Sequence, residues 1–161
     1  MRLTRGTDIA LRVLMVAAAR QRLSTVDELA ELMAVPRNHL AKVVQRLARL
    51  GLLVTVRGRT GGLRIAPEAL TWSVGRVVRE FEGQDEVVDC EHPPCPLRGA
   101  CRLRGALRRA HDAFLAELDA VPLHSLVSPP IADLVTADPV PADRPAADVA
   151  SGDRPHRLPL V

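Results

Sequence analysis

Residues 24–65 read STVDELAELMAVPRNHLAKVVQRLARLGLLVTVRGRTGGLRI, and this stretch decides the fold. Thr25 followed by Glu28 has the form of a capping box and predicts the start of a short helix. Pro36 suits the first position of a second helix, in which apolar residues recur at helical spacing as far as Leu50. Two short helices joined by a tight turn form a helix-turn-helix pattern.

The segment that follows predicts a β-hairpin. Gly51 is typical of the residue that ends a helix. Residues 52–56 then have the composition of a strand, residues 58–62 form a glycine-rich turn, and residues 63–65 suit a second strand. A hairpin directly after a helix-turn-helix is a wing. The expected fold is therefore mainly α, with a winged helix-turn-helix DNA-binding domain at residues 1–70.

Charge is distributed unevenly along the chain. Residues 1–66 carry twelve Arg and Lys against four Asp and Glu, whereas residues 67–127 carry seven against ten. A basic front half favours binding to a polyanion. Aromatic residues make up only 2% of the chain, which argues against base stacking on aromatic side chains. Recognition by a helix in a DNA groove remains.

Candidate DNA contacts lie at the start of the second helix of this pair and on the wing. The helix would present its first residues to base edges in the major groove. The wing would reach the DNA backbone or the minor groove. These candidates are Arg37, Asn38, His39, Lys42, Arg57, Arg59 and Thr60.

Helices are also expected before the helix-turn-helix and after the wing. One runs from Thr7, as its N-cap, to about Arg20, with Asp8 in its first turn, where a carboxylate complements the helix dipole. Residues 71–127 are predicted to hold a helix at 72–82, a cysteine loop, and a long dimerisation helix from about 97 to 120. That long helix has a near-heptad apolar seam made of Leu103, Leu107, Ala110, Phe114 and Leu118. Such a seam suits packing against a second copy of the chain, and packing on its own domain is the alternative.

All the cysteines of the chain, Cys90, Cys95 and Cys101, fall within twelve residues at the spacing C-x4-C-x5-C. An odd number does not close into a disulfide framework, so the cluster favours a soft metal centre, either zinc or iron–sulfur. His92 or His111 is the candidate fourth ligand of a zinc site.

An iron–sulfur electron carrier or a thiol enzyme is the alternative outside DNA-binding proteins, and the basic helix-turn-helix argues against it. No catalytic constellation is present, so an enzyme is not expected.

The remaining segments indicate location rather than chemistry. No apolar run reaches the roughly 18 residues of a membrane span. The apolar run at residues 9–19 is interrupted by Arg12 and is a poor match to a signal peptide. A cytoplasmic protein is expected. Residues 128–161 contain seven of the thirteen prolines and are expected to form a disordered tail.

Taken in order, these motifs resemble the NsrR/IscR-type winged-helix iron–sulfur regulators, and within them the nitric-oxide-sensing NsrR type. The segments that carry the resemblance are residues 3–4, 7–12, 35–44, 46–52 and 57–62, together with the three cysteines. They cover roughly residues 1–120 and leave the tail unmatched.

The resemblance implies a homodimeric repressor that binds an operator in double-stranded DNA while a cluster is held near the dimer interface. Cys90, Cys95 and Cys101 match the family's three cysteine ligands. Asp8 stands where NsrR-type members take the fourth ligand of a [4Fe-4S] cluster from the other subunit. IscR-type members use a histidine three residues after the last cysteine, where this chain has Arg104, which favours the NsrR type. An IscR-like or other redox sensor with a [2Fe-2S] cluster is the alternative. For the NsrR type, nitric oxide is the signal, and loss of the cluster releases the DNA.

Overall fold

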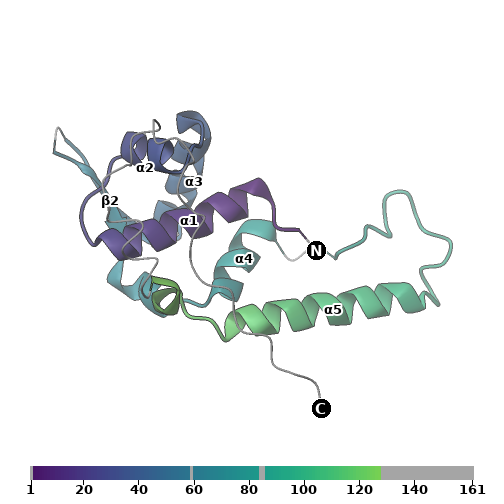
Figure 1. The fold of residues 1–161 in the computed structure, drawn as a ribbon. Coiled ribbons are helices and arrows are strands. Elements are labelled where there is room, and N and C mark those ends of the chain that lie inside the picture. The colour runs from purple at the N-terminus through teal and green to yellow at the C-terminus, as the bar shows by residue number, and fades with distance from the viewer. Residues whose placement is uncertain (1, 59, 84–85, 128–161) are drawn as a thin grey trace, which may run out of the picture.

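The computed structural model describes residues 2–58, 60–83 and 86–127, which form a mainly helical fold with one small sheet (Figure 1). The tail at 128–161 and Arg59 lie outside the described residues. The elements in chain order are α1 (Arg5–Arg20), α2 (Val26–Leu32), α3 (Arg37–Arg49), β1 (Leu53–Val56), β2 (Gly62–Ile65), η1 (Pro67–Thr71), α4 (Val74–Glu82), α5 (Arg102–Asp119) and η2 (Leu123–Val127).

Helix α1 begins earlier than the sequence predicts, because Thr4 rather than Thr7 is its N-cap. The hydroxyl of Thr4 accepts the backbone N–H of Thr7 at 3.3 Å, which satisfies one of the free donors of the first turn. Thr7 lies inside the helix and is fully buried. The expectation that Thr7 caps the helix is therefore wrong, since two threonines three residues apart offer the same capping pattern.

Helices α2 and α3 form the predicted helix-turn-helix. The capping box is present: the N–H of Glu28 donates to the Thr25 hydroxyl at 3.1 Å, and the N–H of Thr25 donates to Glu28 Oε2 at 2.7 Å. The hydrogen bond from Thr25 lowers the pKa of Glu28. Pro36 lies just before α3 instead of at its first position. Gly51 follows α3 with a φ of 73°, a conformation that glycine adopts without a side-chain clash.

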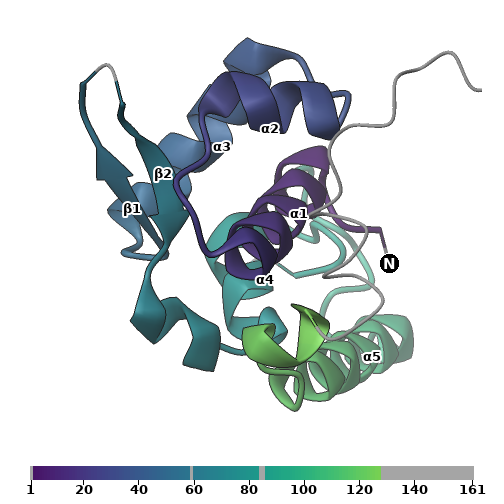
Figure 2. The ribbon, with the colours of Figure 1, turned by 60° about the vertical axis from the view of Figure 1, so that its left-hand side comes forward.

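The wing is also confirmed. Strands β1 and β2 pair antiparallel, with Leu53 opposite Ile65 and Val56 opposite Gly62. Ser24 and Leu63 exchange two backbone hydrogen bonds, of 2.9 and 2.8 Å, so the hairpin is attached to the segment between α1 and α2. Figure 2 shows the hairpin extending beside α3. The mainly α, winged-helix fold is therefore as the sequence predicts.

Helix α5 extends away from the body of the molecule (Figure 1) and contains no buried residue. It begins at Arg102 and not near residue 97, because Cys101 has an extended backbone and serves as its N-cap. After α5 the chain returns to the body, where Leu123 is buried in the core. The N–H of Leu123 donates to the carbonyl of Trp72 at 2.8 Å. Among the described residues, no helix has the length and hydropathy needed to cross a bilayer.

Helix α4 joins α5 to the core. Its buried residues Val74, Val77 and Val78 belong to the same hydrophobic core as α1 and α3. Arg79 of α4 forms an ion pair with Asp119 at the end of α5, with Nη1 donating to Oδ1 at 2.8 Å. The hydrogen bond between the two side chains lowers the pKa of Asp119 and raises that of Arg79. This ion pair fixes the C-terminal end of α5 to the body.

Candidate metal centre and nucleic-acid interface

The three cysteines lie on the loop between α4 and α5 and at the start of α5. Cys90 and Cys95 stand at the two ends of a turn, because the N–H of Cys95 donates to the carbonyl of Cys90 at 3.1 Å. At Cys101, the N-cap, Sγ accepts the N–H of Arg104 at 3.4 Å. All three thiols are free and half-buried. The fold therefore places every thiol of the chain in one short segment.

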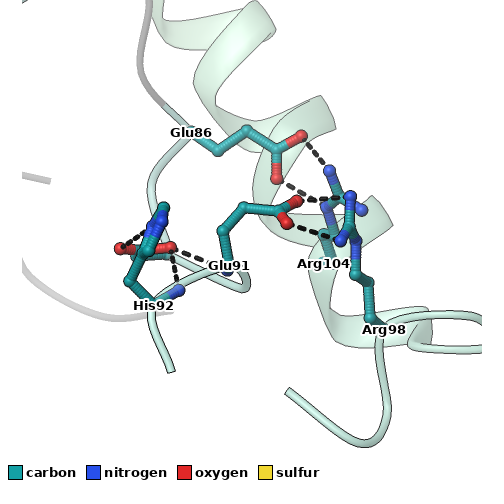
Figure 3. A network of polar contacts seen from close by, with 6 residues as sticks. Glu86, Glu91, His92, Arg98 and Arg104 are labelled. Carbon is teal, nitrogen blue, oxygen red and sulfur yellow. Dashed lines mark hydrogen bonds and ion pairs between the residues drawn. The ribbon is translucent and has the colours of Figure 1, made fainter. Parts of the chain in front are cut away.

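Two arginine–glutamate pairs hold this segment together (Figure 3). Arg104 of α5 donates to both carboxylate oxygens of Glu86, at 2.5 and 2.6 Å. Arg98 pairs with Glu91 within the loop. The hydrogen bond from Arg104 lowers the pKa of Glu86, and the same bond raises the pKa of Arg104. Two of the positive charges beside the thiols are thus matched by carboxylates of the loop.

Of the two candidate zinc ligands, His92 lines the same hollow as Cys90, whereas His111 lines a different one. His92 is 87% exposed, with its Nδ1 3.6 Å from Asp89 Oδ2. His111 lies further along α5, on a hollow between that helix and the loop. In the part of the chain that the structure describes, no three His, Cys, Asp or Glu side chains already form a metal-binding group.

The donor chemistry of the loop nevertheless fits a thiolate-bound metal. Partial burial raises the pKa of the Cys90 thiol, the neighbouring Cys95 and Cys101 raise it further, and the charge of Arg104 lowers it. Cys101 is the N-cap residue of α5, and its Sγ accepts a backbone hydrogen bond there. Soft thiolates suit iron–sulfur clusters and zinc, and a metal replaces their protons on binding.

Asp8 lies in the first turn of α1, as the sequence predicts. Its side chain is 46% exposed, and its Oδ1 accepts a hydrogen bond from Nε of Arg12 at 2.9 Å, one turn later in the helix. Within the described chain Asp8 forms no metal-binding group with the cysteines. The contact occupies one carboxylate oxygen and leaves the side chain at the surface.

A residue that the sequence analysis did not single out, Glu82, ties the start of α1 to the end of α4. Its Oε1 accepts the backbone N–H of Thr4 at 2.7 Å and also the hydroxyl of Thr7. Burial alone would raise the pKa of Glu82, but the hydrogen bonds from Thr7 and Thr4 outweigh it and lower the pKa. No local pattern predicts this contact, since the partners are more than seventy residues apart in the sequence.

The candidate DNA contacts are arranged along one helix and one hairpin. Arg37, Asn38 and Lys42 are exposed on α3, and His39 beside them is half-buried. Arg57 and Thr60 are exposed on the wing, whereas Arg59 lies outside the described residues. The structure thus leaves basic and amide side chains available at the start of the helix that a helix-turn-helix inserts into DNA.

Arg37 and Arg46 both have specific partners in the protein. Nε of Arg37 donates to Oδ1 of Asp27 on α2 at 2.5 Å. Arg46 packs over the ring of Phe81, with its guanidinium carbon 4.4 Å from the ring centroid, and donates to the backbone of α4. Arg46 therefore joins α3 to α4, and the basic charge of the domain is only partly available to DNA.

A wing beside a helix-turn-helix, continued by a cysteine-bearing loop and a protruding helix, defines a winged-helix DNA-binding regulator. The chain belongs to the Rrf2 family: residues 3–129 match the model of that family, which is described as an iron-dependent transcriptional regulator. The resemblance to NsrR/IscR-type regulators is thereby confirmed.

Individual relatives agree with this assignment. The chain is 52% identical over 135 residues to the HTH-type transcriptional repressor NsrR of Streptomyces coelicolor, covering 81% of this chain and 90% of the relative. Its fold is similar to that of CymR, the global cysteine regulator of B. subtilis, with a TM-score of 0.63 and 21% identity over 79% of this chain and 96% of that one. The fold is also similar to that of IscR of T. potens, with a TM-score of 0.60 and 18% identity over 78% of this chain and 86% of that one. As predicted, the protein is a transcriptional regulator and not an enzyme.

Proposed function

We propose that this protein is a homodimeric, cytoplasmic transcriptional repressor whose operator binding depends on an iron–sulfur cluster and responds to nitric oxide. The observation that carries the proposal is the position of the three half-buried thiols, which lie on the loop that joins α4 to α5 and at the N-terminal end of α5. The 52% identity to a transcriptional repressor, NsrR, supports repression.

Cys90, Cys95 and Cys101 would hold a [4Fe-4S] cluster, with Asp8 of the partner subunit as the fourth ligand. Because Arg12 engages only Oδ1 in the contact described above, the second oxygen of Asp8 can serve as the ligand. When bound, such a cluster supplies iron with one carboxylate-held position, a hard and weak ligand that a small molecule such as nitric oxide can replace. A [2Fe-2S] cluster is the alternative.

The dimer would form along α5. No residue of this helix is buried in the single chain, and Leu103 in the apolar seam is 65% exposed. Burying such a seam against a second copy removes apolar surface from water, which is the dominant favourable contribution to association. Residues 71–127 would thus form the cluster-binding and dimerisation unit, and residues 1–70 the DNA-binding domain.

In the dimer, the two α3 helices would enter successive major grooves of an inverted-repeat operator, about one helical turn apart. Base edges would be read by the exposed and half-buried side chains at the start of α3: Arg37, Asn38, His39 and Lys42. The wing would contact the DNA backbone or the minor groove through Arg57, Arg59 and Thr60.

Glu82 provides a route from the cysteine loop to the DNA-binding helices. It lies directly before the loop and hydrogen-bonds the N-terminus of α1. Helix α1 in turn packs against α3. A change in the position of the loop would therefore act on the placement of α3. Coupling energies of about 1–3 kcal/mol correspond to a 5- to 150-fold change in operator affinity.

The test is to purify the protein without oxygen and to measure iron, sulfide, visible absorption and operator affinity before and after nitric oxide. We expect a coloured, iron-containing protein that loses operator affinity when nitric oxide is added. A colourless, iron-free protein that binds its operator tightly contradicts the proposal, and stoichiometric zinc would indicate a zinc regulator. An intact cluster without any operator affinity would indicate an electron carrier.

Replacing Asp8 with alanine tests the fourth ligand. We expect Asp8→Ala to keep the fold and the three thiolate ligands but to change the visible spectrum of the cluster and its reaction with nitric oxide. The matched control is Arg12→Gln, which removes the same ion pair but keeps the carboxylate, and should leave the spectrum closer to that of the wild type. An Asp8→Ala protein with an unchanged spectrum and an unchanged response would remove Asp8 from the site.

A further inference from the structure

Asp27 is an acidic residue in a place where a DNA-binding surface has little use for one. It lies in the first turn of α2, and its side chain is 68% exposed. Residues 1–66 contain only four acidic residues, against twelve basic ones. A carboxylate near the start of the recognition helix repels the phosphates of bound DNA and lowers affinity for every sequence alike. As an acid in the first turn of α2, Asp27 also complements the helix dipole, while Thr25 and Glu28 form the capping box.

The contact that Asp27 makes is specific in geometry. Its Oδ1 accepts a hydrogen bond from Nε of Arg37, the first residue of α3, at 2.5 Å. This contact engages Nε of the guanidinium, and the two terminal nitrogens, Nη1 and Nη2, are not part of it. Two parallel N–H donors are what the O6 and N7 acceptors of guanine require for a bidentate contact.

We propose that Asp27 is a positioning residue for sequence recognition, which orients the Arg37 guanidinium for a bidentate contact with a guanine before DNA binds. The inference rests on the proposed function of Arg37 as a base-reading residue. An arginine side chain loses considerable rotamer freedom when it is fixed at an interface, and a carboxylate that fixes it beforehand reduces this loss on binding. Asp27 therefore contributes selectivity for the operator and weakens general affinity for DNA.

The experiment uses the full-length, cluster-containing protein and two duplexes. One is the duplex that the wild type selects from a random-sequence pool, and the other is a scrambled duplex of the same length and base composition. Affinities for both are measured for the wild type, Asp27→Asn, Asp27→Glu, Arg37→Ala and the double variant Asp27→Asn/Arg37→Ala. Glu31→Gln is the matched control, because it removes one exposed acid from the same helix. Circular dichroism and visible absorption verify that fold and cluster are retained.

We expect Asp27→Asn to lower the ratio of selected to scrambled affinity by about two- to tenfold, the range for ordering one long side chain. Affinity for the scrambled duplex should stay the same or increase. Asp27→Glu should restore part of the ratio, and Glu31→Gln should leave it unchanged. In the Arg37→Ala background, Asp27→Asn should have no further effect on the ratio, because the residue it orients is gone.

Three outcomes overturn the inference. If Asp27→Asn tightens binding to both duplexes equally, the ion pair is only a surface contact. If Asp27→Asn lowers the ratio equally with and without Arg37, Asp27 acts through another residue. If Arg37→Ala itself leaves the ratio unchanged, the base-reading role of Arg37 fails as well, which separates an error in the proposed function from an error in the role of Asp27 alone.

Discussion

Replacing Cys101 with serine is expected to abolish cluster binding while the start of helix α5 stays intact. Cys101 has two roles in the proposal, as a metal ligand and as the N-cap of α5. Serine is among the preferred N-cap residues, so it keeps the cap, but its hydroxyl is a poor substitute for a soft thiolate. The Cys101→Ser protein should lose iron, sulfide and visible absorption, and its operator affinity should fall 5- to 150-fold.

Cys101→Ala is the matched variant, because it removes both the ligand and the cap. We expect it to lose the cluster equally and to be less stable than Cys101→Ser by about 0.5–2 kcal/mol. The comparison separates the effect of the metal on DNA binding from the effect of the helix start. A Cys101→Ser protein with full iron content and wild-type operator affinity would contradict the assignment of this cysteine as a ligand.

Gly75→Ala is expected to destabilise the contact between α4 and α5. A Cβ at position 75 would lie 2.3 Å from Oδ1 of Asp119 and 2.9 Å from its backbone nitrogen. A backbone atom at that distance has to move, so the two helices would be pushed apart. Overpacking of this kind costs about 1–3 kcal/mol. Chemical unfolding of the reduced, iron-free chain, at one fixed protein concentration, would measure the loss.

Gly105→Ala provides the control for this prediction. Gly105 lies inside α5, and a Cβ there would meet only the end of the Arg109 side chain, at 3.5 Å. Alanine is favoured over glycine in a helix interior by up to about 1 kcal/mol, so Gly105→Ala should be neutral or stabilising. Equal destabilisation by both substitutions would mean that glycine content, and not the close approach of the helices, accounts for the effect.

Local patterns in the sequence were sufficient to predict the DNA-binding fold. The capping box at Thr25 and Glu28, the glycine after α3 and the strand composition of the hairpin are all short-range signals, and the structure has the elements that they predict. The errors are at helix starts. Thr4 and Thr7 offer the same pattern, and only the burial of Thr7 decides between them. The apolar pattern of α5 extends to residue 97, but the extended backbone of Cys101 begins the helix later.

The candidate site is less accessible from sequence, because its contacts join distant segments. The cysteines could be found from their spacing alone, whereas their relation to Asp8 remains a prediction. Glu82 contacts Thr4 across 78 residues, and Asp27 contacts Arg37 across a turn between helices. Neither acid belongs to a recognisable motif. Such pairs depend on how the helices pack, which a pattern within one helix does not specify.

The way α5 is attached has a mechanical consequence. Its C-terminal end is fixed to the body by Asp119 and by the return of the chain at Leu123, while Cys101 stands at the opposite end. A helix of 18 residues is about 27 Å long. If the C-terminal end stays in place, a tilt of the helix by about 5° moves its N-terminal end by about 2 Å. A displacement of that size at Cys101 therefore corresponds to a tilt of only a few degrees of the whole helix.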